Sequence, residues 1–99
     1  MENQNADETR ITQVKIRFAD KTKKGLVGWA SCILDNAIFL NNVMILRDES
    51  GRYSLRFPIK KSKRNKIYSY FEPVSDESMQ MFTKAIYDKL KETDADEYR

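Results

Sequence analysis

Basic side chains are concentrated in one part of this 99-residue chain. Between positions 52 and 66 there are seven positive residues and no acid, although fifteen acids occur elsewhere. The seven are Arg52, Arg56, Lys60, Lys61, Lys63, Arg64 and Lys66. Lysine and arginine release condensed counterions when they contact nucleic-acid phosphates, so this segment predicts a phosphate-binding surface. If about five of the seven make contact, log K should fall with log salt at a slope of roughly −4 to −5.

Neutral residues of the same segment can add hydrogen bonds. Ser62 and Asn65 suit phosphates or base edges, and the planar guanidinium of Arg64 suits a two-bond contact with guanine. The alternative interpretation is a solvated turn whose lysines keep a sheet edge from aggregating. The absence of interleaved acids favours phosphate binding. A second basic cluster is more simply a solvated hairpin turn, and it comprises Lys21, Lys23 and Lys24.

Aromatic residues raise the question of base stacking. Tyr68 and Tyr70 would share one face of a strand beside the basic segment, and exposed rings there could stack on single-stranded bases. Aromatic residues in strands are more often packed in a core or against a cross-strand neighbour, which is the interpretation we favour for both tyrosines. We expect Trp29 and Phe39 in the core for the same reason, and Cys32 as a small buried hydrophobic residue.

Side chains for catalysis are scarce. The chain has no histidine and one cysteine, which excludes internal disulfides, zinc sites built on Cys and His, and histidine-activated nucleophiles. Adjacent acids at positions 48–49 and 76–77 fit a solvated loop and a helix start, with no third ligand spaced to join them. We therefore expect a protein that is not an enzyme and that holds no metal or other cofactor.

The first elements of the chain can be assigned from its periodicity. Residues 1–9 are too polar and acidic to order, and predict a disordered tail. "ITQVKIRF" (11–18) alternates apolar and polar residues like a half-buried strand, whereas "LVGWASCIL" (26–34) is apolar on both faces like a central strand. Asp35 and Asn36 then supply a turn.

Further strands follow that turn. "AIFL" and "VMIL" are divided by Asn41 and Asn42, a pattern that fits either two short strands or one bent strand. Residues 53–57 alternate as another strand, which Pro58 ends. The basic segment then reads as a loop, and residues 67–71 fit a short strand after it.

The last predicted element is an amphipathic helix. Ser75 or Asp76 can cap its start, and acids in the first turn suit the helix dipole. Its apolar stripe consists of Met79, Phe82, Ile86 and Leu90. We predict an α+β fold in which this helix packs on a small, mainly antiparallel sheet. The prediction is one domain over residues 10–92 with a short acidic tail at 93–99, in a soluble cytoplasmic protein that has no membrane segment.

Short strings along the chain are similar to segments of the SpoVG family, small bacterial regulators named for stage V sporulation and septation. The strings are "VKIR", "ASCILD", "IFLNNVMIL", "LRFP" and "PVSDES", in that order. None is a catalytic signature, but together they span most of the domain. The resemblance implies an antiparallel sheet with a C-terminal helix, a homodimer formed through the β-sheet, and a non-enzymatic regulator that binds DNA and often RNA.

The same resemblance implies which residues contact nucleic acid. The family's basic segment after "LRFP" corresponds to Lys60, Lys61, Lys63 and Arg64. This chain departs from the family pattern, because its turn "SKRNK" lacks the usual Pro-Gly pair and acid, so its sequence preference should differ. The competing hypothesis from another class is a protein-interaction module whose basic loop docks an acidic protein partner.

Overall fold

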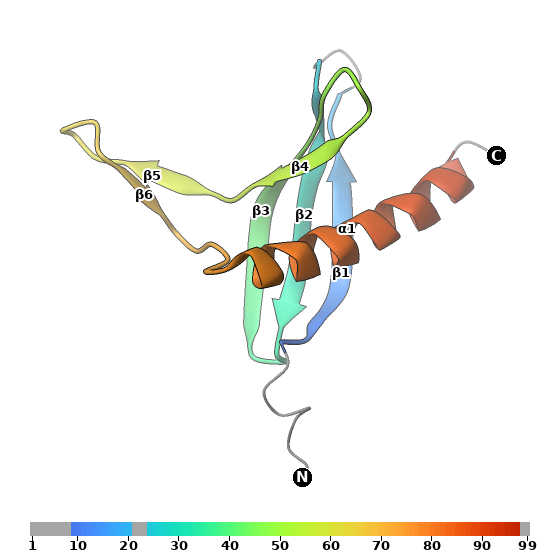
Figure 1. Ribbon diagram of the computed structural model, residues 1–99, viewed down its shortest axis with the longest axis horizontal. Helices are drawn as coiled ribbons and strands as arrows, with labels where there is room; N and C mark the ends of the chain where they lie inside the picture. Colours follow the sequence, from blue (N-terminus) through green and yellow to red (C-terminus); the bar gives the residue numbers. More distant parts are fainter. Residues whose placement is uncertain (1–8, 21–23, 98–99) are drawn as a thin grey trace, which may run out of the picture.

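The chain folds into a four-stranded sheet, a separate two-stranded sheet and one long helix (Figure 1). The computed structural model describes residues 9–20 and 24–97, so residues 1–8 of the predicted tail at 1–9, together with Lys21 and Lys23, lie outside the described residues. The elements in order are β1 Ile11–Phe18, β2 Leu26–Leu34, β3 Ile38–Arg47, β4 Tyr53–Arg56, β5 Ile59–Lys61, β6 Ile67–Ser69 and α1 Asp76–Glu97. The α+β class predicted from the sequence is confirmed.

The larger sheet is an antiparallel meander in the order β1-β2-β3-β4. Three residues, Asp35 to Ala37, join β2 to β3, and Asp35 and Asn36 there both have positive φ, 53° and 56°. Paired positive φ values match the right-handed twist of the flanking strands, and Asx residues tolerate them. The amide of Ala37 donates to the carbonyl of Leu34 across this turn at 2.9 Å. The turn predicted from the sequence is thus confirmed.

The two apolar runs around Asn41 and Asn42 belong to one strand, β3, which settles the alternative left open by the sequence. Asn42 has a φ of 65°, and its amide donates to the side-chain oxygen of Asn41 at 2.8 Å. The pairing of β2 with β3 shifts register at the same level, between Ala30 and Cys32. The asparagine pair therefore distorts the strand locally without ending it.

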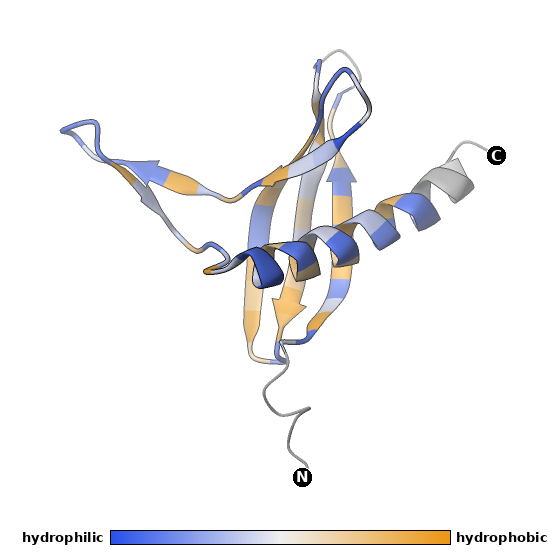
Figure 2. Cartoon of the chain, viewed as in Figure 1, coloured by the Kyte–Doolittle hydropathy of each residue, from blue (hydrophilic) through white to orange (hydrophobic). Residues whose placement is uncertain are grey.

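The core lies between α1 and one face of the four-stranded sheet. Phe82, Ile86 and Leu90 of the helix join buried side chains of β2 and β3 in this core, and Figure 2 shows hydrophobic residues along both strands. Met79, predicted in the same stripe, is 36% exposed at the helix start. Cys32 is buried as predicted, and burial raises the pKa of its thiol.

Ser75 caps the start of α1. Its Oγ accepts a hydrogen bond from the Ser78 amide at 3.1 Å, and the Ser78 Oγ accepts one from the Ser75 amide at 3.1 Å. This reciprocal pair resembles a capping box in which serine replaces the usual glutamate. The sequence had left Ser75 and Asp76 as alternatives, and the structure selects Ser75.

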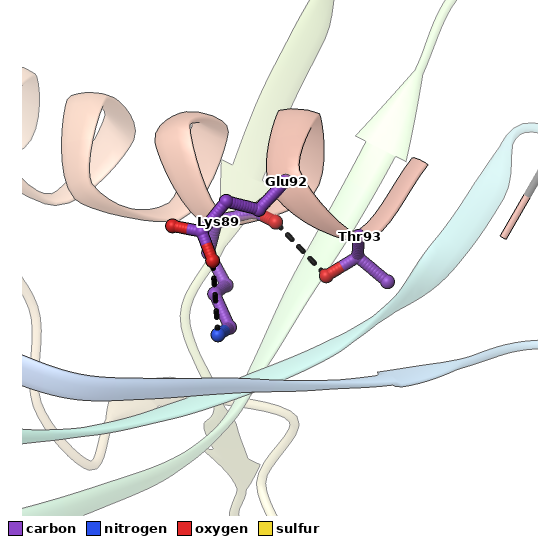
Figure 3. A network of polar contacts seen from close by, with 3 residues as sticks. All are labelled: Lys89, Glu92 and Thr93. Atoms are coloured by element: carbon purple, nitrogen blue, oxygen red, sulfur yellow. Dashed lines mark hydrogen bonds and ion pairs between the residues drawn. The ribbon is translucent and has the colours of Figure 1, made fainter. Parts of the chain in front are cut away.

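The helix continues to Glu97, so residues 93–97 have a helical backbone where the sequence favoured a tail from 93 onward. Two side-chain contacts lie just before this end of α1 (Figure 3). Lys89 Nζ lies 3.5 Å from Glu92 Oε1, and Thr93 Oγ1 donates to the carbonyl of Lys89 at 2.9 Å. The Lys89–Glu92 pair, three residues apart on the helix surface, stabilises the turn from which α1 continues to Glu97.

Candidate nucleic-acid interface

The basic segment is a β-hairpin rather than the loop expected from the sequence. Strands β5 and β6 pair antiparallel, with Lys60 opposite Tyr68 and Lys61 opposite Ile67. The hairpin projects away from the larger sheet and from α1 (Figure 1), and every residue of both strands is exposed. Strand β5 was missed because "IKK" is short and has no apolar alternation, whereas the predicted strand at 67–71 corresponds to β6.

The turn of the hairpin is held by Ser62. Its Oγ accepts hydrogen bonds from the amides of Arg64 at 3.2 Å and Lys66 at 3.1 Å. Its amide donates to the carbonyl of Lys66 at 2.8 Å, while Asn65 adopts a φ of 66°. Ser62 and Asn65 therefore have backbone roles that the sequence interpretation did not include, because Asn tolerates the left-handed conformation that closes the turn.

Five exposed cations lie on this hairpin, namely Lys60, Lys61, Lys63, Arg64 and Lys66. Among the side chains that the structure describes, in residues 9–20 and 24–93, no carboxylate forms an ion pair with any of the five. Figure 2 shows the turn as a continuous hydrophilic tip. Unpaired cations on a projecting turn are free to contact an anionic surface without first breaking an internal contact.

One side of the hairpin combines a cation with aromatic rings. Because directly paired residues share a face, Lys60 and Tyr68 lie on the same side, and alternation adds Tyr70. Tyr68 is 53% exposed and Tyr70 is 65% exposed. Neither tyrosine packs in the core, because no described element covers the hairpin, whereas packing across the strands is compatible with the direct pairing of Tyr68 with Lys60. We call the side with Lys60, Tyr68 and Tyr70 the tyrosine face.

The opposite side is more apolar. Ile59 and Ile67 lie there with Lys61, and the isoleucines are 50% and 62% exposed. We call this side the isoleucine face. A two-stranded hairpin without a covering layer is only marginally stable in water, so two exposed isoleucines on its surface suggest a further contact.

Arg52 and Arg56, the remaining predicted contacts, lie outside the hairpin. Arg52 sits in the turn before β4, where its amide donates to Asp48 Oδ1 at 2.9 Å. Hydrogen bonds from Ser50 and Arg52 hold the pKa of Asp48 below its usual value. Arg56 is on β4 opposite Met44. The structure thus brings six of the eight predicted residues together on the hairpin, and places Arg52 in a turn and Arg56 on the larger sheet.

Sequence reasoning missed a second group of polar and aromatic residues, on the sheet face that α1 does not cover. Phe39, expected in the core, is 63% exposed, and Trp29 is only partly buried. The Arg17 guanidinium carbon lies 4.6 Å from the centre of the Trp29 ring. The signal was present in the alternation of "VKIRF", which places Lys15 and Arg17 on the solvent side of β1.

The described part of the chain can also be assessed for metal binding and for membrane-spanning helices. Among the described residues, no three His, Cys, Asp or Glu side chains converge as metal ligands. No helix in that part of the chain is long and apolar enough to cross a membrane.

In comparisons with known proteins, residues 9–92 match the family model described as SpoVG, and this match covers most of the chain. No curated protein matches the chain.

Proposed function

The chain belongs to the SpoVG family, and on that premise we propose that it is a cytoplasmic, non-enzymatic regulator that binds DNA, and also RNA, through the β5–β6 hairpin. The observation that carries the proposal is the projecting hairpin with five exposed cations and no acid between residues 52 and 66. Phosphates are closely spaced along a nucleic acid, so several of these cations can contact phosphates at the same time. The turn can enter a groove or contact the phosphate backbone of a nucleic acid, because no other described element surrounds it.

Specificity in this proposal belongs to the turn and to the tyrosine face. Arg64 is the only arginine of the hairpin and can pair with guanine through two parallel hydrogen bonds. Its amide is held by Ser62, so its backbone position is set before binding. Tyr68 and Tyr70 are available for bases that leave the duplex, which would suit an RNA loop.

The proposal includes a homodimer that forms through sheet surfaces, and the isoleucine face is the part of the structure that best supports it. Burying the exposed parts of Ile59 and Ile67 in both chains would contribute about 3–7 kcal/mol, at 1.5–3 kcal/mol per fully buried side chain. Association costs ~4–15 kcal/mol, so these residues alone give a weak dimer. Sedimentation over a concentration series should show a monomer–dimer equilibrium, which Ile67→Lys shifts toward the monomer.

Neutralising the hairpin tests the proposed function. The variant Lys60→Gln/Lys61→Gln/Lys63→Gln/Arg64→Gln removes four charges. A matched control, Lys24→Gln/Lys84→Gln/Lys89→Gln/Lys91→Gln, removes the same number elsewhere. Lys61 points away from the tyrosine face, so three of the four substitutions remove a duplex contact. If each surface contact contributes up to about 1 kcal/mol, the hairpin variant should bind a DNA duplex up to roughly 150-fold more weakly, while the control stays within a few fold of wild type. Equal losses in both variants would mean that net charge alone drives binding.

The second candidate function is binding of an acidic protein partner, in which the hairpin cations pair with carboxylates of that partner instead of phosphates. The exposed isoleucines favour this alternative, because an acidic protein partner could cover them and pair with Lys61. Pull-down from a nuclease-treated lysate separates the two functions. A protein that remains bound to wild type but not to the hairpin variant after nuclease treatment would support the interaction module.

A further inference from the structure

One face of the four-stranded sheet carries no covering helix. Along β2, Gly28, Ala30 and Cys32 are buried, and Ala30 and Cys32 belong to the core that α1 covers, whereas the alternate residues Trp29 and Ile33 are only partly buried. Because successive side chains point to opposite faces, Trp29 and Ile33 lie on the side away from the helix. We call this side the open sheet face.

Strand pairing places a row of side chains straight across the open sheet face. Arg17 of β1 is opposite Trp29, Trp29 is opposite Met44 of β3, and Met44 is opposite Arg56 of β4. Directly opposite residues share a face, so an aromatic ring and a thioether are flanked by an arginine on each side. The Arg17 guanidinium stacks on the Trp29 ring at 4.6 Å from its centre.

Two further residues extend this row along the strands. Lys15 pairs with Ser31, which puts another cation on the open sheet face, and Phe39 pairs with Ile33, which puts an exposed ring on it. No aspartate or glutamate occurs within β1–β4. The open sheet face therefore combines three cations and two aromatic rings on strands that contain no acid.

We propose that the open sheet face is a second binding site, and that its ligand is single-stranded nucleic acid. Bases stack on Phe39 and, once the Arg17 guanidinium moves from the ring to a phosphate, on Trp29, while Lys15 and Arg56 contact further phosphates. Both sheets would then bind nucleic acid through separate residues, so this site extends the proposed function of the hairpin without using its side chains.

The chemistry selects a single strand over a duplex. A duplex exposes mainly phosphates and groove edges, whereas a strand that is not paired offers the π-faces that Trp29 and Phe39 can contact. Trp29 and Ile33 are four residues apart on β2, or about 13 Å at ~3.3 Å per residue, and Phe39 lies opposite Ile33. This spacing far exceeds the ~3.4 Å between stacked nucleotides, so the two rings contact bases that are not adjacent.

A second copy of the chain is a poorer occupant of the same surface. Face-to-face association would bring three cations of one chain against three of the other, with no acid in the strands to compensate. Like charges brought together in this way are repelled and lose hydration. The charge of the open sheet face thus favours an anionic ligand, and the isoleucine face of the hairpin stays the proposed dimer surface.

Trp29 is the only tryptophan of the chain and reports directly on this site. We would titrate the protein with a single-stranded 12-nucleotide oligomer and with the corresponding duplex while recording tryptophan emission. Saturable quenching by the single strand, weak or absent with the duplex, is the expected result. The hairpin variant Lys60→Gln/Lys61→Gln/Lys63→Gln/Arg64→Gln should retain this quenching. Duplex binding by the same hairpin variant is measured separately, and its loss is the result that the proposed function predicts.

Adjacent residues on opposite faces provide a matched pair of variants. Phe39→Ala should weaken single-strand binding by roughly 5- to 150-fold, because it removes one stacking contact. Ile38→Ala should leave that binding unchanged. Ile38 is also exposed, but it pairs with Leu34 of β2, so its side chain lies on the face of the sheet that α1 covers. Circular dichroism confirms that both variants are folded.

Several outcomes would overturn the proposal. They are equal quenching by duplex, equal affinities of Phe39→Ala and Ile38→Ala, or loss of the quenching in the hairpin variant. Quenching of the same strength by poly-glutamate would assign the face to an acidic protein. A change in Trp29 emission on dilution without oligomer would assign it to a second copy of the chain.

Discussion

Lys60 and Lys61 are neighbours in sequence, but they point to opposite faces of the β5–β6 hairpin. A duplex that contacts the turn and the tyrosine face would therefore meet Lys60 and not Lys61. Counting Lys60 with the turn cations Lys63, Arg64 and Lys66 leaves four phosphate contacts per hairpin rather than five. We expect Lys60→Gln and Lys61→Gln to have different effects on the salt dependence of binding.

The size of the difference follows from counterion release. At about 0.9 per contact, four contacts predict a slope of about −3.6 for log K against log salt, which is a loss of roughly 150-fold in affinity between 50 and 200 mM salt. Lys60→Gln should reduce the slope to about −2.7 and the loss to roughly 40-fold, whereas Lys61→Gln should match wild type. If a dimer places two hairpins on one duplex, both the slope and its change double.

Fluorescence anisotropy with a labelled duplex, at four salt concentrations, measures these slopes. The two variants have the same net charge, so each is the control for the other. Equal slopes for Lys60→Gln and Lys61→Gln would refute the assignment of the tyrosine face to the contact surface. A wild-type slope near zero would refute phosphate binding by the hairpin altogether.

Three predictions concern the fold that positions these surfaces. Ile86→Ala should lower the free energy of unfolding, measured by urea denaturation, by about 2–5 kcal/mol, because Ile86 is only 1% exposed. Met81→Ala, which changes an exposed residue of the same helix, should cause a much smaller loss. Gly28→Ala should cost ~1–3 kcal/mol and lower the Tm, because a Cβ at Gly28 would lie close to the carbonyl oxygen of Arg17; an unchanged Tm would contradict this contact. The thiol of Cys32 should react with a disulfide reagent at pH 8 only after unfolding, because burial both shields it and raises its pKa, and rapid reaction of the native protein would show that it is accessible.

Local patterns were sufficient for most elements of the fold. The alternation of Ile11–Phe18, the apolar run Leu26–Leu34 and the spacing of Phe82, Ile86 and Leu90 each predicted an element that the structure contains. These signals are local, because the periods of 2 and 3.6 residues are properties of the backbone itself. Strand β5 has no such signal, since a three-residue strand with two lysines is specified by its pairing with β6.

The charge of the candidate interface is also a local property, because the acid-free segment from Arg52 to Lys66 can be read directly from the chain. Which cations share a surface depends on the tertiary structure. Pairing of β3 with β4 holds Arg56 on the larger sheet, while the hairpin carries Lys60 to Lys66 away from it. Exposure of the rings at Trp29 and Phe39 depends on tertiary structure for another reason. A strand that is apolar on both faces gives no indication of which face a single helix will cover, and only the packing of α1 leaves these two rings on the open side.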